Sequence, residues 1–385
     1  MIIQEYGDIN FLVGVNGSGK SRYLNKIAKK YKDYRYNVLA ISNTVFDKID
    51  SKYCKKISAN RGRYMLKKTF LESLMHDDKS VGAFNIIDYL GFKREVKILF
   101  KFSKGIGKRN LYNHLLDKLV AIDPSENNEI NIYDIDEICN IFLDQMDDQG
   151  EGRFCLSLND FDVRNKTKYN YFLKKILKFK TLNKIVEIDI LLLKNNGEFS
   201  LRATSSGEAH FLSNMLFLLN NLVYNKQNII LIDEPEISLH PKWQREYVLE
   251  IYDYFYKNDI KLFIATHAPL IISKVQVSSA DIYQDYLRKI KYNIFKVNDQ
   301  QLHVVVEDDD YSVESLYWEV FGILTPDNSF LSRHCVDLLD KFDLEEISYY
   351  KIKEEFNRLK DACDLKLQKQ VLEDIENRFL NKNEH

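Results

Sequence analysis

The feature that most constrains this chain is a glycine-rich loop between an apolar run and a helical pattern near the N-terminus. Residues 9–13 are mostly apolar, as a buried strand requires, and apolar residues recur with helical spacing after position 20. Residues 14–21 read G-V-N-G-S-G-K-S, which fits the phosphate-binding pattern G-x-x-x-x-G-K-[ST]. Strand, glycine loop and helix in this order predict an α/β fold with a nucleotide site.

Each residue type in this loop suits phosphate binding. Glycine backbones adopt angles that a side chain forbids, so successive N–H groups can face phosphate oxygens. The helix N-terminus adds its partial positive charge. We expect Lys20 to reach the β- and γ-phosphates of ATP and Ser21 to bind Mg²⁺. The predicted nucleotide-binding residues of the loop are Gly14, Asn16, Gly17, Ser18, Gly19, Lys20 and Ser21.

Two later apolar runs end in residues suited to hydrolysis. Residues 228–233 end in Asp233 and are followed by Glu234, and the carboxyl ends of buried strands are where α/β folds bind ligands. We predict that Asp233 binds Mg²⁺ and that Glu234 is the general base that polarises the attacking water. Residues 261–267 form the second run, and their last residue, His267, is predicted to sense the γ-phosphate and orient that water.

Four motifs in this order resemble the ATPase heads of the ABC family, in the variant found in RecF, SMC and OLD ATPases. They are the loop, A-T-S-S-G-E-A at 203–209, which resembles the ABC signature, D-E-P-E-I-S-L-H-P at 233–241, and A-T-H-A-P at 265–269. The resemblance implies an α/β P-loop ABC ATPase head with ATP and Mg²⁺ as cofactors. It leaves the middle third and the last eighty or so residues of the chain uncovered.

The signature segment has the spacing of a capping box. Ser205 and Glu208 stand three residues apart, so we expect Ser205 to cap the helix that Gly207 and Glu208 open. In the resembled family this helix end faces nucleotide held by a second subunit. The resemblance therefore implies a homodimer or higher even oligomer that sandwiches ATP, with Ser205, Gly207 and Glu208 binding nucleotide. A plain helix cap is the alternative.

The glutamine loop of ABC proteins, whose amide helps to hold Mg²⁺, has no clear counterpart. The apolar run at 36–42 ends at Asn43, whose side chain is also an amide, and we predict Asn43 as a metal ligand. Gln145 and Gln149 lie far along the chain and are poorer candidates. The alternative is that Asn43 only caps a turn.

The regions outside the motifs are predicted to be mainly helical. Residues 166–184 have the pattern of an amphipathic helix. Residues 186–197 contain an apolar run followed by an N-G turn, which predicts a hairpin that leads into the signature. The predicted domains are an ATPase head (1–50 and 182–292), a mostly helical insert (51–181) and a helical, partner-docking C-terminal region (293–385).

The insert begins with a basic run, which is a candidate surface for binding nucleic acid. The formal net charge of −2 excludes a simple basic nucleic-acid binder, but a local stripe could meet phosphates. The favoured interpretation is a solvated surface. The run contains Lys52, Lys55, Lys56, Arg61, Arg63, Lys67 and Lys68.

Four acidic residues at 307–310 follow a β-like run, as in the metal site of OLD nucleases. A Toprim nuclease also needs a D-x-D on a second strand, and none follows. Asp337, Asp340 and Asp343 fall at helical spacing instead. We interpret the four acids as a solvated helix start and not as a nuclease site.

The chain carries no pattern of a signal peptide, a membrane span or a zinc or disulfide framework. Its five cysteines are scattered, without a C-x-x-C pair. We expect a cytoplasmic protein without a membrane partner.

The small head, without long coiled-coil arms, resembles ATPase subunits of bacterial anti-phage systems such as Septu, PARIS and retron-linked modules. That resemblance implies a switch or sensor that acts with a separate nuclease or toxin. The alternative is a RecF-like repair ATPase that binds DNA itself. A transporter motor is disfavoured by the L-H-P extension at 239–241 and by the long insert.

Overall fold

The computed structural model shows two compact units, residues 1–56 with 223–385, and residues 57–222. The structure describes residues 6–44, 47–58, 62–102, 106–107, 109–120, 132–145, 147–148, 152–159, 173, 186–237, 239–280, 290–298, 301–305, 317–318, 329–361, 363 and 366–380.

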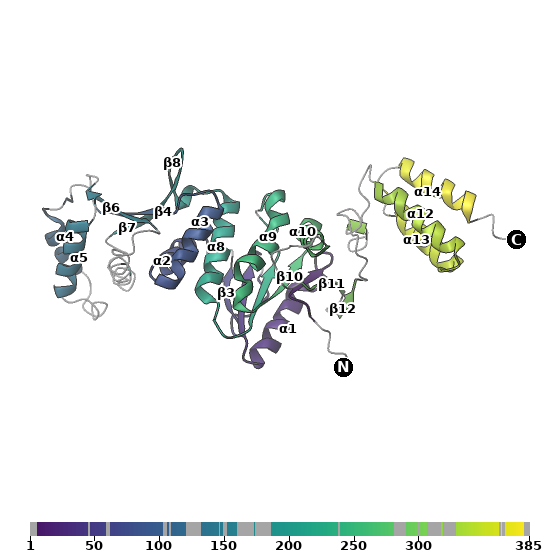
Figure 1. Cartoon of the computed structure of the whole chain (residues 1–385), viewed down its shortest axis with the longest axis horizontal. Coiled ribbons are helices and arrows are strands. Elements are labelled where there is room, and N and C mark those ends of the chain that lie inside the picture. Colours follow the sequence, from purple (N-terminus) through teal and green to yellow (C-terminus); the bar gives the residue numbers. More distant parts are fainter. Residues whose placement is uncertain are drawn as a thin grey trace. The chain divides into compact units, whose positions relative to one another are not determined.

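The first unit contains a seven-stranded, mostly parallel sheet (Figure 1). The strand order is β12-β11-β1-β10-β9-β2-β3, and only β12 is shown to run antiparallel to its neighbour, β11. Because β10 lies between β1 and β9, the carboxyl ends of these three strands meet at one edge. The strands are β1 (Ile9–Val13), β2 (Asn37–Ser42), β3 (Lys55–Ser58), β9 (Asn228–Asp233), β10 (Ile260–Thr266), β11 (Tyr292–Asn298) and β12 (Gln301–Val304).

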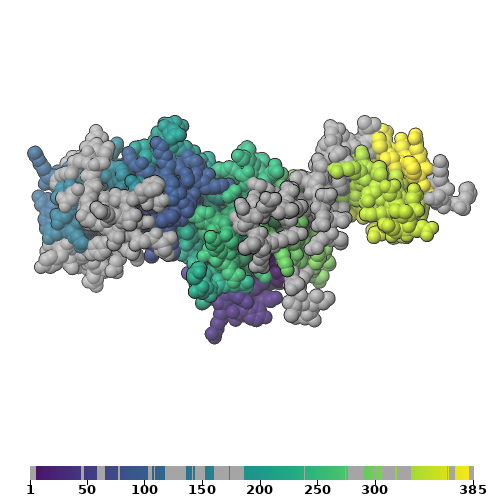
Figure 2. Space-filling view, in the orientation of Figure 1, coloured from purple at the N-terminus to yellow at the C-terminus, as the bar shows by residue number. Residues whose placement is uncertain are grey.

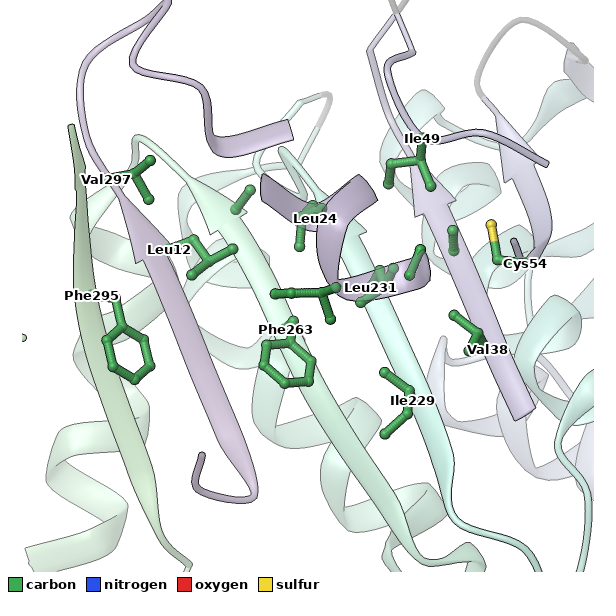
Figure 3. Close-up of a cluster of buried hydrophobic side chains, with 14 residues drawn as sticks. Leu12, Leu24, Val38, Ile49, Cys54, Ile229, Leu231, Phe263, Phe295 and Val297 are labelled. Atoms are coloured by element: carbon green, nitrogen blue, oxygen red, sulfur yellow. The ribbon is translucent and has the colours of Figure 1, made fainter. Parts of the chain in front are cut away.

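Helix α1 (Lys20–Asp33) buries its apolar stripe, including Leu24 and Ile27, against one face of this sheet. Alternate strand residues, such as Leu231 and Phe263, point to the helix and fill the core between them (Figure 3). The alternate residues that point to the other face of the sheet, such as Ile230 and Ile232, are also fully buried. Both faces of the sheet are therefore covered. Helices α9 (Pro241–Phe255) and α10 (Pro269–Ala280) pack on one another, and α9 contacts β10. The predicted strands and the helix after the loop are confirmed.

The second unit contains a five-stranded antiparallel sheet in the order β5-β6-β4-β7-β8. The prediction of a mostly helical insert at 51–181 missed this sheet. In β4 every second residue is buried, which is the period of a strand with one covered face. The strands are β4 (Glu95–Lys101), β5 (Asp147–Asp148), β6 (Arg153–Asn159), β7 (Glu187–Lys194) and β8 (Gly197–Ser200).

The hairpin predicted at 186–197 is confirmed, because β7 pairs with β8 and Lys194 stands opposite Gly197. Helix α8 (Ser206–Asn221), which starts at the signature, packs against α2 and α3. For this reason the structure groups residues 182–222 with the insert and not with the head. In the part of this unit that the structure describes, the other α-helices are α2 (Gly62–Leu74), α3 (Asp77–Tyr89), α4 (Leu111–Val120) and α5 (Ile132–Gln145).

Helix α8 is anchored near its C-terminal end by Asn220. Its side-chain nitrogen donates to the Thr69 carbonyl at 2.9 Å, and its side-chain oxygen accepts from Ser73 Oγ at 3.1 Å. The backbone carbonyl of Asn220 accepts from Lys79 Nζ at 3.0 Å. These polar contacts with α2 and α3 hold the helix that carries the signature.

Three C-terminal helices share a core of their own, but the start of the region predicted as a helical appendage (293–385) instead forms β11 and β12 of the first sheet. The three helices are α12 (Ser329–Asp343), α13 (Tyr349–Asp361) and α14 (Lys366–Phe379), and Figure 2 shows them as one continuous body. Their core is built around Trp318, Phe356 and Leu372. The helical spacing of Asp337, Asp340 and Asp343 is confirmed, and all three are exposed.

Two predicted segments fall on residues that the structure does not describe. They are the amphipathic helix at 166–184, of which only residue 173 is described, and the acids at 307–310. Among the described residues, no helix has both the length and the apolar character that a membrane span needs.

Candidate nucleotide site

The loop after β1 uses backbone angles that only glycine adopts readily. Gly14 has φ +150°, and a Cβ there would lie 2.9 Å from Ser18 Oγ and 3.0 Å from the Val297 carbonyl oxygen. Gly19, which precedes α1, has φ +98°. Asn16 and Gly17 lie exposed at the tip, and Ser18 is half-buried. The loop therefore has the shape and the small residues that let backbone N–H groups approach a phosphate.

Lys20 lies almost fully buried at the start of α1. Its Nζ donates to the carbonyl oxygens of Gly14 at 2.8 Å and Val15 at 3.1 Å. Burial lowers the pKa of this ammonium, whereas the nearby carboxylates of Glu234 and Asp233 oppose that shift. The ammonium is thus held at the loop, beside the acids at the end of β9.

Ser21 and Asp233 meet across the sheet edge. Ser21 Oγ donates to Asp233 Oδ1 at 3.0 Å, and Asp233 is fully buried at the end of β9. Burial raises the pKa of Asp233 from 3.8 to about 7, and the Ser21 hydrogen bond opposes this. Among the described residues its other oxygen, Oδ2, is buried without a partner. A hydroxyl and an unsatisfied carboxylate oxygen are hard donors, and they fit Mg²⁺.

Asp233→Asn is expected to stabilise the Mg²⁺-free fold above neutral pH. A carboxyl whose pKa is raised on folding stabilises the fold below about pH 4 and loses that contribution as the pH rises through about 7. The neutral amide keeps the acceptor for Ser21 but avoids a buried charge, a gain on the order of 2–4 kcal/mol at pH 8.

The measurement is the melting temperature in EDTA from pH 5 to 8. The advantage of the variant over wild type should grow with pH, while its Mg-ATP binding is lost. An advantage that does not change with pH would mean that Asp233 is ionised throughout.

Glu234 has a strained backbone, with φ +50°, a left-handed conformation uncommon for a residue with a side chain. Its N–H donates to the Ala265 carbonyl at 2.8 Å, and its own carbonyl accepts from Asn43 Nδ2 at 3.1 Å. The N–H of Asn43 donates to the Asp233 carbonyl at 3.2 Å. The buried Asn43 therefore lies beside the acidic pair and supports the turn that carries Glu234. Its role as a metal ligand stays a prediction.

His267 follows β10 and faces two carboxylates. Its Nδ1 lies 3.0 Å from Glu236 Oε1 and 3.8 Å from Glu234 Oε1. The hydrogen bond with Glu236 raises the pKa of His267, although burial opposes the shift. The position predicted for His267, one strand from Asp233 and Glu234, is the one observed. Glu236 was not predicted; it stands in the D-E-P-E motif, but a sequence does not show which acid contacts the histidine.

The capping box predicted at the signature is confirmed. Ser205 Oγ accepts from the Glu208 N–H at 3.2 Å, and the Ser205 N–H donates to Glu208 Oε2 at 3.0 Å. Ser205 is exposed, while Gly207 and Glu208 are half-buried. These three residues belong to the second unit, and the loop, Asp233, Glu234 and His267 belong to the first.

Lys194 is a second contact that the sequence did not indicate. From the end of β7, its Nζ donates to Glu208 Oε1 at 3.1 Å and lies 4.2 Å from the centre of the Phe92 ring. Burial alone would raise the pKa of Glu208, but hydrogen bonds from Ser205 and Lys194 lower it overall. The hairpin thus fixes the Glu208 carboxylate at the start of α8.

One curated relative is the "Retron Vc95 probable ATPase" of Vibrio cholerae serotype O1 biovar El Tor. It is 31% identical to this chain over 103 residues, which are 24% of this chain and 20% of the relative. The match thus spans far less than two thirds of the relative's length.

A protein family matches a longer stretch, residues 68–273. The range includes the signature helix, the strand that ends in Asp233, and His267, and it begins after the phosphate-binding loop. The match covers more than half of the chain, and it takes in much of the predicted insert (51–181) as well as residues 182–273 of the predicted head. The protein therefore belongs to the family described as "AAA domain, putative AbiEii toxin, Type IV TA system" and, with its N-terminal phosphate-binding loop, is a P-loop ATPase.

Proposed function

We propose that the protein is an ABC-type switch that binds Mg-ATP, hydrolyses it slowly and thereby changes its association state. The observation that carries this proposal is the convergence at one sheet edge of Lys20, the Ser21–Asp233 pair, Glu234 and His267. These are the groups that phosphate binding, metal binding, water activation and γ-phosphate contact require.

Each residue takes one task in this scheme. Lys20 exchanges its loop carbonyls for phosphate oxygens, and Ser21 and Asp233 hold the metal ion. The Mg²⁺ ion supplies charge neutralisation at the phosphates. Glu234 accepts a proton from the attacking water, and His267 donates to the terminal phosphate and keeps the water in line. Asn43 keeps the Glu234 backbone in its strained turn.

The signature supports a further part of the proposal, an ATP sandwich. Ser205 lies exposed at the N-terminus of the 16-residue helix α8, where backbone N–H groups and the helix dipole favour an anion. We therefore propose a homodimer or higher even oligomer in which Ser205, Gly207 and Glu208 of one copy bind ATP held by the other. ATP would drive closure because it binds the closed state better than the open one.

We further propose a role in anti-phage defence, with a separate effector, a nuclease or a toxin. The support is the similarity to an ATPase named for a retron, together with the resemblance of the small head to ATPase subunits of such systems. In this role the nucleotide state of the ATPase restrains or releases the effector.

The basic run gives less support to the RecF-like alternative. Lys56 pairs with Asp47 at 2.8 Å, and Lys67 donates to the Ile188 carbonyl at 3.0 Å. Lys68 lies 3.8 Å from Glu72. Three residues of the basic run are thus engaged within the protein, which favours a partner protein as the effector.

The proposed role is tested by purifying the tagged chain from its native host and identifying what accompanies it. A nuclease, toxin or reverse transcriptase in a fixed ratio is the expected result. Recovery of DNA without a partner protein would instead favour the repair ATPase. A binding assay with neutralised Lys52 and Lys55, both exposed, then decides whether DNA is held by this run.

A further inference from the structure

The turn after Asp233 and Glu234 contains a buried carboxylate, Glu236, whose residue is 7% exposed. One of its oxygens, Oε1, accepts three hydrogen bonds. The donors are Thr266 Oγ1 at 2.9 Å, the His267 backbone N–H at 2.8 Å and His267 Nδ1 at 3.0 Å. Its other oxygen, Oε2, is buried without a partner among the described residues. Burying a carboxylate is costly unless it is bonded, so the three bonds to Oε1 must offset that cost, and they indicate a defined role.

These bonds fix the histidine at two points. Because one oxygen of Glu236 accepts from both the backbone and the ring of His267, the ring cannot turn without breaking a charge-assisted hydrogen bond. With Nδ1 directed to the carboxylate, Nε2 is the nitrogen left for a ligand. The side chain of His267 is 41% exposed, so a ligand can reach it.

Glu236 is itself held from helix α9. Its backbone carbonyl accepts from the Leu239 N–H at 3.1 Å and from Gln244 Nε2 at 3.4 Å. Gln244 also donates to the Leu239 carbonyl at 3.1 Å. The carboxylate therefore stands on a braced turn between β9 and α9, which is the kind of rigid support that a positioned catalytic group needs.

We propose that Glu236 is a positioning residue of the ATPase site, which holds the His267 imidazole with Nε2 toward the terminal phosphate of ATP. This inference rests on the proposed function. In a positioning role, Glu236 affects catalysis only through the His267 imidazole. In a purely structural role, it would stabilise the end of β10, and its effect would not depend on that imidazole.

A double-mutant cycle tests this route. Glu236→Ala is expected to lower kcat for ATP by about 10²-fold, as a misplaced catalytic group does, with little change in KM. His267→Ala should lower kcat at least as much, and the double variant should be no slower than His267→Ala. Glu236→Gln, which keeps an acceptor oxygen, should recover part of the loss. Glu373→Ala, at an exposed site on α14, is the control for the loss of a carboxylate.

A purely structural role gives a different outcome. If Glu236→Ala slows the His267→Ala protein by the same factor as wild type, the positioning role is overturned. If Glu236→Ala does not fold, Glu236→Gln replaces it in the same double-mutant cycle, and the expected decrease in kcat is then smaller.

A readout that needs no ATP separates this inference from the proposed function. In the protein labelled with ¹⁵N-histidine, the imidazole signal of His267 is identified among eight histidines by its loss in His267→Ala. Wild type should show a proton on Nδ1, and Glu236→Ala should shift that signal. An unchanged signal would overturn the inference, whereas a shifted signal in a protein without ATPase activity would overturn only the proposed function.

Discussion

Replacing Glu234 with Gln is expected to lower the rate of ATP hydrolysis by about 10²- to 10⁴-fold, the usual contribution of a general base, while ATP still binds. The amide has nearly the shape of the carboxylate but cannot accept the proton of the attacking water. The strained backbone should be kept, because its two hydrogen bonds, with Ala265 and Asn43, involve only main-chain atoms of Glu234. Single-turnover hydrolysis and equilibrium ATP binding measure the two effects separately.

The same variant tests the ATP sandwich. Because hydrolysis no longer opens the closed state, light scattering with Mg-ATP should show a stable increase in mass, to twice the monomer mass or a higher even multiple. Glu72→Gln, a half-exposed glutamate on α2, is the matched control and should behave as wild type. If Glu234→Gln has the same mass with and without ATP, the sandwich fails, although the assignment of the general base is untouched.

Lys20→Ala is expected to weaken ATP binding by about 10²-fold or more. A hydrogen bond between charged groups contributes about 1.5–3 kcal/mol, and Lys20 is predicted to contact two phosphates. The ATP-dependent association of the chain should disappear with it. Isothermal titration with ATP measures the affinity, and circular dichroism checks that the fold persists.

Lys29→Ala is the control for this change, since Lys29 lies exposed on the same helix. It should bind ATP as wild type does. If Lys20→Ala kept its affinity for ATP, the phosphate-binding role of the loop would be wrong, whatever the result for Glu234.

Most of the candidate site could be predicted because its signals are local. The loop at 14–21 and the acidic end of β9 are short segments, in which each residue's neighbours along the chain are also its neighbours in space. The capping box is equally local, since Ser205 and Glu208 share one helical turn. Asn43 could be predicted as part of the site because it follows an apolar run at 36–42. The hydrogen bond from its amide nitrogen to the Glu234 carbonyl could not be predicted.

The second sheet could not be predicted, because its strands pair over long distances along the chain. In β4 the alternation of buried residues marks a strand, yet its neighbour β7 begins at Glu187, far along the chain. The run of helices α2 and α3 before β4 favours a helical interpretation of the whole insert. Only the pairing of β4 with the distant strands β6 and β7 builds the sheet whose one face the alternating residues of β4 can bury.

The sequence by itself therefore determined the fold class, the phosphate-binding loop, the acidic strand end and the position of His267, because backbone geometry and local spacing dictate them. The tertiary structure alone decided which acid holds His267, since Glu234 and Glu236 lie two residues apart and both far from it along the chain, and only folding brings Glu236 to 3.0 Å. It also decided that Lys194 fixes Glu208, because a hairpin must form before the two meet. Contacts of this kind depend on how buried charges find partners in three dimensions, and no spacing along the chain records them.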